Sequence, residues 1–202
     1  MQRLGSGGDR IHLDLHVDDP RAAADRASGL GAREVADQGH VLMVSPGGFA
    51  FCFVPGGPGE RPRPWTRAGG HAALLDQVCL DVPHERFDAE CNFWSALTGW
   101  DQARSRVSDD FRPLHRPPDQ PLRILLQRLG ADDPGGVTRA HLDWACTDRA
   151  AETERHVGLG ATVEAVRDRW TVFADPTGRR YCLTDRDPTS GLLPVPPRTV
   201  AP

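Results

Sequence analysis

One segment of the chain occurs twice. Residues 12–32 and 141–161 align without a gap, and 10 of the 21 positions are identical. Both copies begin with His-Leu-Asp and end with Gly-Leu-Gly-Ala. Each continues into two apolar runs separated by a turn sequence, Pro-Gly-Gly at 46–48 and Asp-Pro-Thr-Gly at 175–178. Such repetition restricts the chain to folds that are assembled from copies of one module.

Local patterns predict the elements of this module. Both copies open with alternating polar and apolar side chains, which is typical of a half-buried strand. Asp19 and Asp148 are expected to cap the helices that follow. Gly29 and Gly158 are expected to end those helices in the left-handed conformation. With the Arg/Glu/Val-rich segment and the two apolar runs that come next, each unit is predicted to be β-α-β-β-β.

A third, more divergent copy lies between the other two. Residues 75–82 alternate like the other first strands, and residues 86–98 have apolar side chains at helical spacing. Gly99 is expected to stop this helix, and residues 123–129 are predicted to form the last strand. Residues 102–120 should then hold two strands, although prolines interrupt them.

The three units define the domain organisation that we expect. Residues 11–54 form a single module, and residues 75–185 form a contiguous domain of two modules. Residues 55–74 are a linker by their Pro and Gly content, and residues 186–202 are a Pro-rich tail.

Composition narrows the functional classes. The 202 residues carry 24 basic residues, all Arg, against 28 acidic ones, a formal net charge of −4. Without a concentrated basic surface, we expect no nucleic-acid partner. No apolar run approaches the roughly 20 residues that cross a bilayer, and the first residues do not form a secretory signal. We therefore expect a cytoplasmic protein without a membrane partner.

The cysteine content also indicates the cytoplasm. There are five of them, an odd number without a Cys-x-x-Cys pair, and each lies in an apolar stretch. A cysteine in such a stretch behaves as a small apolar side chain. We predict reduced, structural thiols, as is usual in a reducing compartment.

The ordered set of motifs resembles the vicinal oxygen chelate superfamily, which includes glyoxalase I, the bleomycin-resistance proteins and the extradiol dioxygenases. Its glyoxalase-like subgroup is the most similar part. The shared motifs are the His-Leu-Asp strand, the Asp-capped helix ending in Leu-Gly-Ala, the Trp/Asp-Pro-x-Gly/Tyr-Cys-Leu ending, and the Phe-Trp helix end. In this chain they are residues 141–143, 148–161, 170–183 and 93–100. The resemblance covers residues 11–54 and 75–185.

The resemblance implies an α+β fold in which two βαβββ modules pair into a half-open, eight-stranded barrel, or cup, around a ligand. Residues 75–185 would form one cup, and residues 11–54 would be an additional single module, half of another. An unpaired module exposes a sheet edge and apolar surface. Either an upstream module or a second copy of the chain would cover it, and we expect a homodimer.

Strand alternation predicts which side chains face the hollow. The polar side of each first strand is expected to do so. These residues are His12, Asp14 and His16 in the first unit, Gln77, Cys79 and Asp81 in the second, and His141, Asp143 and Ala145 in the third.

Metal-dependent relatives take a His or Gln from the first strand of each half and a Glu from the last. The resemblance places Gln77 and His141 at the first-strand positions, and Gln127 and Cys182 at the last-strand positions. His12 and Cys52 are their counterparts in the single module. Because both expected carboxylates are missing from residues 75–185, we expect no metal cofactor there. A zinc site that uses His141 and Cys182 is the alternative.

His141 and Asp143 lie two residues apart on one strand face. They would act as a general base with its carboxylate, or else hydrogen-bond to neighbouring strands and hold the halves together. The recurrence of the pair as His12 and Asp14 favours the structural role. His141 is nevertheless the best candidate for a catalytic residue.

The predicted ligand-binding residues share a position on the cup face or at its rim, where Trp170 would stack on a flat molecule. They are Gln77, Gln127, His141, Asp143, Trp170 and Cys182.

Three functions are compatible with these features. The first is metal-independent binding of a small organic molecule in the cup formed by residues 75–185. The second is a lyase, isomerase or dioxygenase that uses His141, with or without a divalent metal. The third is a dimeric scaffold without small-molecule chemistry. Fold alone does not separate these functions.

Overall fold

The computed structural model describes residues 11–57 and 59–194. The chain divides into two compact units, Met1–Arg61 with Val78–His141 and Pro62–Gln77 with Leu142–Pro202. Two long strands, β6 (Ala72–Val82) and β9 (Arg139–Cys146), contribute residues to both. Residues 195–202 of the predicted tail lie outside the described residues. Within residues 11–57 and 59–194, no helix has the length and apolar character needed to cross a membrane.

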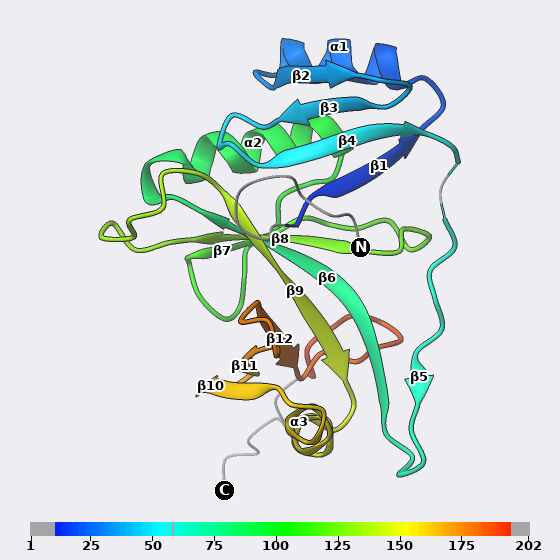
Figure 1. Ribbon diagram of the computed structural model, residues 1–202, viewed down its shortest axis with the longest axis vertical. Helices are drawn as coiled ribbons and strands as arrows, with labels where there is room; N and C mark the ends of the chain where they lie inside the picture. The colour runs from blue at the N-terminus through cyan, green and yellow to red at the C-terminus, as the bar shows by residue number, and fades with distance from the viewer. Residues whose placement is uncertain (1–10, 58, 195–202) are drawn as a thin grey trace, which may run out of the picture. The chain divides into compact units, whose positions relative to one another are not determined.

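The first module has the predicted β-α-β-β-β order and belongs to the first unit. Its elements are β1 (Leu13–Val17), α1 (Pro20–Gly29), β2 (Arg33–Asp37), β3 (Val41–Val44) and β4 (Ala50–Pro55). The sheet order is β1-β4-β3-β2, with β1 parallel to β4 and the other pairs antiparallel. Helix α1 covers one face of this sheet (Figure 1) and buries three alanines against it.

The predicted helix caps are confirmed. The Asp19 carboxylate accepts a hydrogen bond from the backbone N–H of Ala22 at 3.0 Å. In the third module, Asp148 accepts one from Ala151 at 2.9 Å. Each carboxylate satisfies a donor that the first helical turn leaves unpaired.

The helices end at the predicted glycines, but those glycines are not the left-handed residues. Gly29 and Gly158 are still helical, and the left-handed residues are Gly31 (φ +100°) and Gly160 (φ +95°). Both glycines of Gly-Leu-Gly can adopt a positive φ. The left-handed residue comes two positions later than predicted because the N–H of the intervening leucine still bonds to the last helical carbonyls.

The middle of the second module differs from the predicted β-α-β-β-β order. After β6 come η1 (His84–Arg86), α2 (Phe87–Thr98), β7 (Phe111–Pro113) and β8 (Arg123–Arg128). Gly99 ends α2 in the left-handed conformation, as predicted (φ +71°). Residues 102–120 contain one short strand and an isolated bridge between Gln102 and Leu114 rather than two full strands. The prolines of this segment have no N–H to donate to a ladder.

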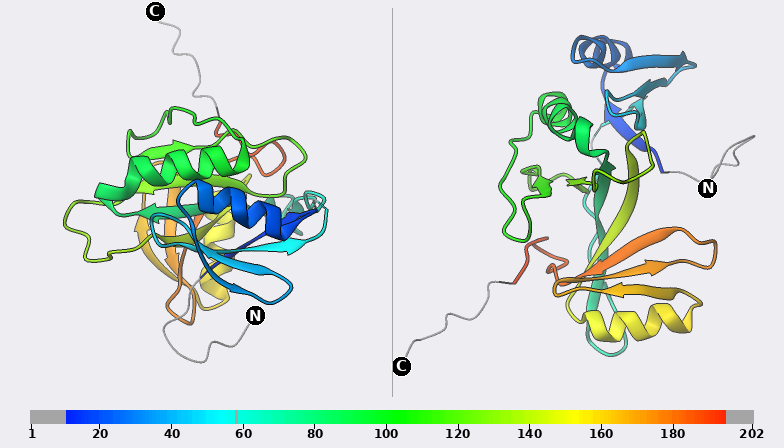
Figure 2. Two further views of the ribbon diagram at one scale, coloured as in Figure 1. Left: turned by 90° about the horizontal axis from the view of Figure 1, so that it is seen from above. Right: turned by 90° about the vertical axis from the view of Figure 1, so that its left-hand side faces the viewer.

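Helix α2 packs on the sheet of the first module within the first unit (Figure 2). The ring centroids of Phe51 and Trp94 lie 5.2 Å apart, and those of Phe51 and Phe93 lie 6.0 Å apart. Aromatic edges and faces meet here in the tilted and T-shaped geometries that such rings prefer. The first module therefore has a covered face, and the shared aromatic core joins it to the second.

A buried carboxylate fixes this packing. Glu90, on α2, accepts hydrogen bonds from Ser45 Oγ at 2.5 Å, from the backbone N–H of Gly47 at 2.6 Å and from Trp94 Nε1 at 3.0 Å. Burial raises the pKa of Glu90, although these three donors act in the opposite direction. The Ser45–Gly48 turn of the first module is thus held directly by α2.

The second unit contains the end of the third module. Its elements are α3 (Arg149–Gly158), β10 (Thr162–Val166), β11 (Trp170–Ala174), β12 (Arg180–Thr184) and the two-residue β5 (Trp65–Thr66). The strand order is β10-β11-β12-β9, with β12 parallel to β9. Its β10–β11 pair has a register shift between Val163 and Ala165, the counterpart of the shift between Glu34 and Ala36 in the first module. The duplication therefore extends to an irregularity of the sheet.

Helix α3 also carries a buried carboxylate. The Glu152 carboxylate accepts hydrogen bonds from Arg67 Nε at 3.0 Å and from Arg155 Nε at 2.9 Å. His71 Nε2 also lies 3.0 Å from it. Burial would raise the pKa of Glu152, but the hydrogen bonds from Arg155 and Arg67 outweigh it and the pKa is lowered. Residues 65–71, within the predicted linker, are therefore bonded to α3 and include the strand β5, which pairs with β6.

Candidate functional site

Two of the predicted ligand-binding residues lie together in the first unit. Gln127, on β8, has its Oε1 atom 3.7 Å from Cys79 Sγ. A ring nitrogen of His141, on β9, lies within 4.8 Å of the same sulfur atom. Cys79 is buried on β6, and its thiol is also 4.0 Å from Asp81 Oδ1. Strands β6, β8 and β9 thus bring a thiol, an amide, a carboxylate and an imidazole to one place.

The imidazole in this group has a fixed partner. His141 Nδ1 lies 2.8 Å from Asp81 Oδ2, and the side chains of both residues are partly exposed, 16% and 17%. An ionised carboxylate only accepts, so Nδ1 carries the hydrogen and Nε2 is left as an acceptor in the neutral ring. A carboxylate in this position sets both the tautomer and the orientation of the imidazole.

The other predicted residues belong to the second unit. Gln77 Nε2 donates to Asp143 Oδ2 at 2.5 Å, and both side chains are buried. Cys182, on β12, lies opposite Asp143 in the parallel β9–β12 pair. A second row of polar and thiol groups is therefore present in this unit.

Trp170 lies one row away from that group. It begins β11 and pairs with Thr184, which in turn pairs with Ala145. Alternate residues of a strand share a face, and rows two residues apart are about 6.5–7 Å apart. Trp170 is partly exposed on the same side of the sheet as Cys182.

Two residues of the first-unit group were missed as site residues. Alternation predicts Asp81 and Cys79 on the cup face, but the carboxylate predicted beside His141 is Asp143, two residues away on the same strand. In the structure, His141 bonds to Asp81 and Asp143 bonds to Gln77. Alternation predicts the face, whereas only the register between strands decides which residues meet.

The four positions that correspond to the metal ligands of the family carry Gln77, Gln127, His141 and Cys182. Gln77 and Gln127 are neutral amides, already used by Asp143 and Cys79, and Cys182 replaces a carboxylate. A divalent ion of the Fe, Ni or Mn type is held by carboxylate and imidazole ligands. Gln77, Gln127, His141 and Cys182 do not fit such an ion, because they offer one imidazole and no carboxylate.

The repeated βαβββ modules are those of the vicinal oxygen chelate superfamily. The family model described as "Glyoxalase-like domain" matches residues 1–54 and 77–184. The chain belongs to this family. No curated protein matches the chain.

Solved structures show the same fold. A Mn(II)-bound glyoxalase from Novosphingobium aromaticivorans matches with a TM-score of 0.60 and 16% identity, over 93% of this chain and 69% of that one. BphC, a halotolerant catechol dioxygenase, gives 0.56 and 14%, over 88% and 68%. A mutant of 4-hydroxymandelate synthase from Streptomyces coelicolor gives 0.54 and 18%, over 89% and 72%. At these identities the likeness concerns the fold alone.

Proposed function

We propose that the chain binds a small organic molecule, without a metal, in the cup that residues 75–185 would form. The observation that carries the proposal is the group of Cys79, Asp81, Gln127 and His141. It offers directional hydrogen-bonding groups, one of them a partly exposed imidazole, on apolar strands. Binding sites for small molecules have this composition, mostly apolar with a few oriented polar groups.

Trp170, in the second unit, supports the binding of a flat ligand. Trp170 is an aromatic platform beside the row of Asp143 and Cys182, and indole rings stack on flat ligands. We therefore expect an aromatic or amphipathic ligand. All five cysteines lie in the described residues, are buried and form no disulfide, which suits the cytoplasm, where we place the protein.

Binding is tested by titrating chelator-treated protein with a panel of aromatic and amphipathic compounds while recording tryptophan fluorescence. Saturable quenching by at least one compound is expected, and it should be weakened at least tenfold in His141→Ala. His40→Ala, an exposed histidine of the first module, is the matched control and should bind like the wild type. The absence of saturable binding by any compound, or equal binding by His141→Ala, would contradict the proposal.

A lyase, isomerase or dioxygenase is the second candidate. The Asp81–His141 hydrogen bond favours it, because a carboxylate that orients an imidazole is the arrangement in which histidine acts as a general base. Turnover of a bound compound, lost in both His141→Ala and His141→Gln, would support an enzyme. Metal content, measured on protein purified without a His-tag, separates the metal-dependent version from the metal-independent one.

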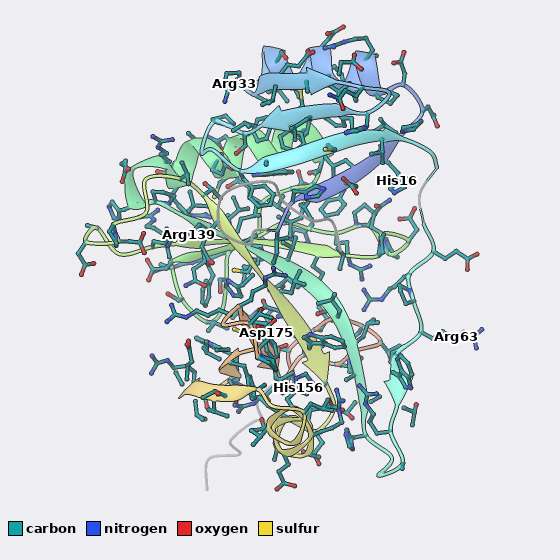
Figure 3. All side chains as sticks on the ribbon, viewed as in Figure 1. His16, Arg33, Arg63, Arg139, His156 and Asp175 are labelled. Atoms are coloured by element: carbon teal, nitrogen blue, oxygen red, sulfur yellow. The ribbon has the colours of Figure 1, made fainter. Side chains whose placement is uncertain are left out.

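The homodimer is also a proposal. In the first module, β1 and β2 lie at the two ends of the four-stranded sheet within the described residues, and the face opposite α1 carries exposed His16 (Figure 3). A second copy would cover such a face. Light scattering coupled to gel filtration should give twice the chain mass at micromolar concentration. A monomer there would contradict the dimer and leave the binding proposal intact.

A further inference from the structure

We propose that His12, Asp14 and Cys52 bind a borderline divalent cation such as Zn²⁺ in the first module. One potential ligand atom of each residue lies within 4.8 Å of the others. The inference goes beyond the proposed binding function, because none of the three residues belongs to residues 75–185.

The backbone places these side chains together. In the parallel β1–β4 pair, Asp14 lies opposite Cys52. His12 precedes Asp14 by two residues, so that both side chains leave the same face of the sheet. All three groups come from one module. Asp14 matches neither the first-strand nor the last-strand position through which metal-dependent relatives hold their ion.

The distances suit a tetrahedral ion. Zn–N bonds of about 2.0–2.1 Å and Zn–O bonds of about 2.0–2.2 Å, at a tetrahedral angle, separate the two ligand atoms by roughly 3.4 Å. His12 Nε2 and Asp14 Oδ1 lie 3.3 Å apart. The side chains therefore need little movement to share an ion.

The chemistry of the donors selects the kind of ion. A thiolate and an imidazole favour zinc and its neighbours over Mg²⁺ and Ca²⁺, which prefer oxygen ligands only. Three protein ligands leave a fourth position for water, as in zinc sites that are open to ligands. The His12 and Asp14 side chains are 39% and 52% exposed, so an ion can reach them from solvent.

The third module provides an internal comparison. By sequence, His141, Asp143 and Cys182 correspond to the three proposed ligands, and Asp143 lies opposite Cys182 in the same parallel register. There, however, His141 bonds to Asp81, and Asp143 bonds to Gln77. In the first module, His12 Nε2 and Asp14 Oδ1 lie 3.3 Å apart. His141 and Asp143 thus have hydrogen-bond partners on β6, whereas His12 and Asp14 are exposed beside the buried Cys52.

The test is a titration of the full chain with Co²⁺, which replaces Zn²⁺ and gives a near-ultraviolet charge-transfer band when a thiolate coordinates it. We expect one Co²⁺ per chain, a thiolate band, and loss of the band when Zn²⁺ is added. Cys52→Ser should abolish the band. His12→Ala and Asp14→Asn should each weaken Co²⁺ binding at least tenfold, and circular dichroism checks that each variant is folded.

Cys182→Ser is the matched control, because it removes the corresponding thiol of the third module; its band should equal that of the wild type. Asp14→Asn keeps the test decisive if Cys52→Ser fails to fold, since Asp14 is exposed. No band in the wild type, a band that persists in Cys52→Ser, or a band lost in Cys182→Ser would each overturn the assignment.

Discussion

His141 Nδ1 lies 2.8 Å from Asp81 Oδ2, so that a carboxylate of β6 orients the imidazole of β9. The two residues are 60 positions apart in sequence. A hydrogen bond to a charged partner contributes roughly 1.5–3 kcal/mol, more than a neutral one. Asp81 therefore helps to set the orientation of His141.

Replacing Asp81 should weaken ligand binding without unfolding the protein. In Asp81→Asn, the amide can present its N–H₂ to Nδ1 and reverse the imidazole tautomer. We expect the affinity for a ligand found in the fluorescence titration to fall about tenfold, equivalent to about 1.4 kcal/mol. Asp88→Asn, on the exposed side of α2, is the control and should bind normally. Equal affinities for the two variants would show that Asp81 does not position His141 for the ligand.

Much of the fold could be predicted because the duplication displays the same pattern twice. Alternation and the capping aspartates gave the β-α-β-β-β order, and Asp19 and Asp148 cap as expected. The helix ends were predicted correctly, but the left-handed residue was not, because both Gly29 and Gly31 can adopt a positive φ. Which of them adopts it depends on where the last helical hydrogen bonds form.

The candidate site could be predicted by face but not by contact. Alternation put Gln77, Asp81, His141 and Asp143 on the polar side of their strands. The register between strands, which depends on packing across the whole sheet, then joined Gln77 to Asp143 and Asp81 to His141. The sequence does not fix the register between strands. It therefore predicts contact between residues that are close on one strand, such as His141 and Asp143.

The turn held by Glu90 has no room for a side chain at Gly47. A Cβ there would lie 2.6 Å from Glu90 Oε2 and closer still to Thr138 Oγ1. We expect Gly47→Ala to lower the free energy of unfolding by about 1–3 kcal/mol, the usual cost of overpacking a filled site. Gly29→Ala is the matched control: nothing lies within 4 Å of its Cβ, and alanine in the helix should leave stability unchanged or raise it by up to about 1 kcal/mol.

Urea denaturation of both variants measures this difference. A Gly47→Ala protein as stable as Gly29→Ala would mean that the Ser45–Gly48 turn is not packed against α2.

Glu90 should make stability depend on pH in one direction. Burial raises its pKa, so the folded state favours the protonated form, whereas the unfolded side chain titrates near 4.3. The stabilising contribution is therefore complete below about pH 4.3 and is lost as the pH rises through the raised folded pKa. In Glu90→Gln this dependence is absent, so the stability of the wild type relative to the variant should fall as the pH rises from 4 to 8.

Urea denaturation at several pH values gives that difference. Glu85→Gln, an exposed residue just before α2, should show no such trend. A difference between wild type and Glu90→Gln that stays constant with pH would contradict the raised pKa.

His156 should produce the opposite dependence in the second unit. It lies on α3 (Figure 3), and its Nδ1 atom is 2.7 Å from the hydroxyl of Tyr181. Burial, followed by the charge of Arg155, lowers its pKa, so the folded state favours the neutral ring. The contribution of His156 is therefore present above the unfolded value of about 6.5 and is lost as the pH falls through the lowered folded pKa.

His156→Gln keeps a polar side chain but does not titrate. Between pH 7.5 and pH 5, the wild type should lose stability relative to this variant, and tryptophan fluorescence during urea unfolding reports it through Trp144, whose ring centroid lies 6.0 Å from that of His156. His40→Gln, at an exposed position, should follow the wild type. Glu152, also buried on α3, keeps a lowered pKa and lies 3.3 Å from His156 Nε2, so its contribution is likewise lost towards acid and the difference reports the His156–Glu152 pair together. A wild-type profile parallel to that of His156→Gln would mean that His156 is not desolvated in the folded protein.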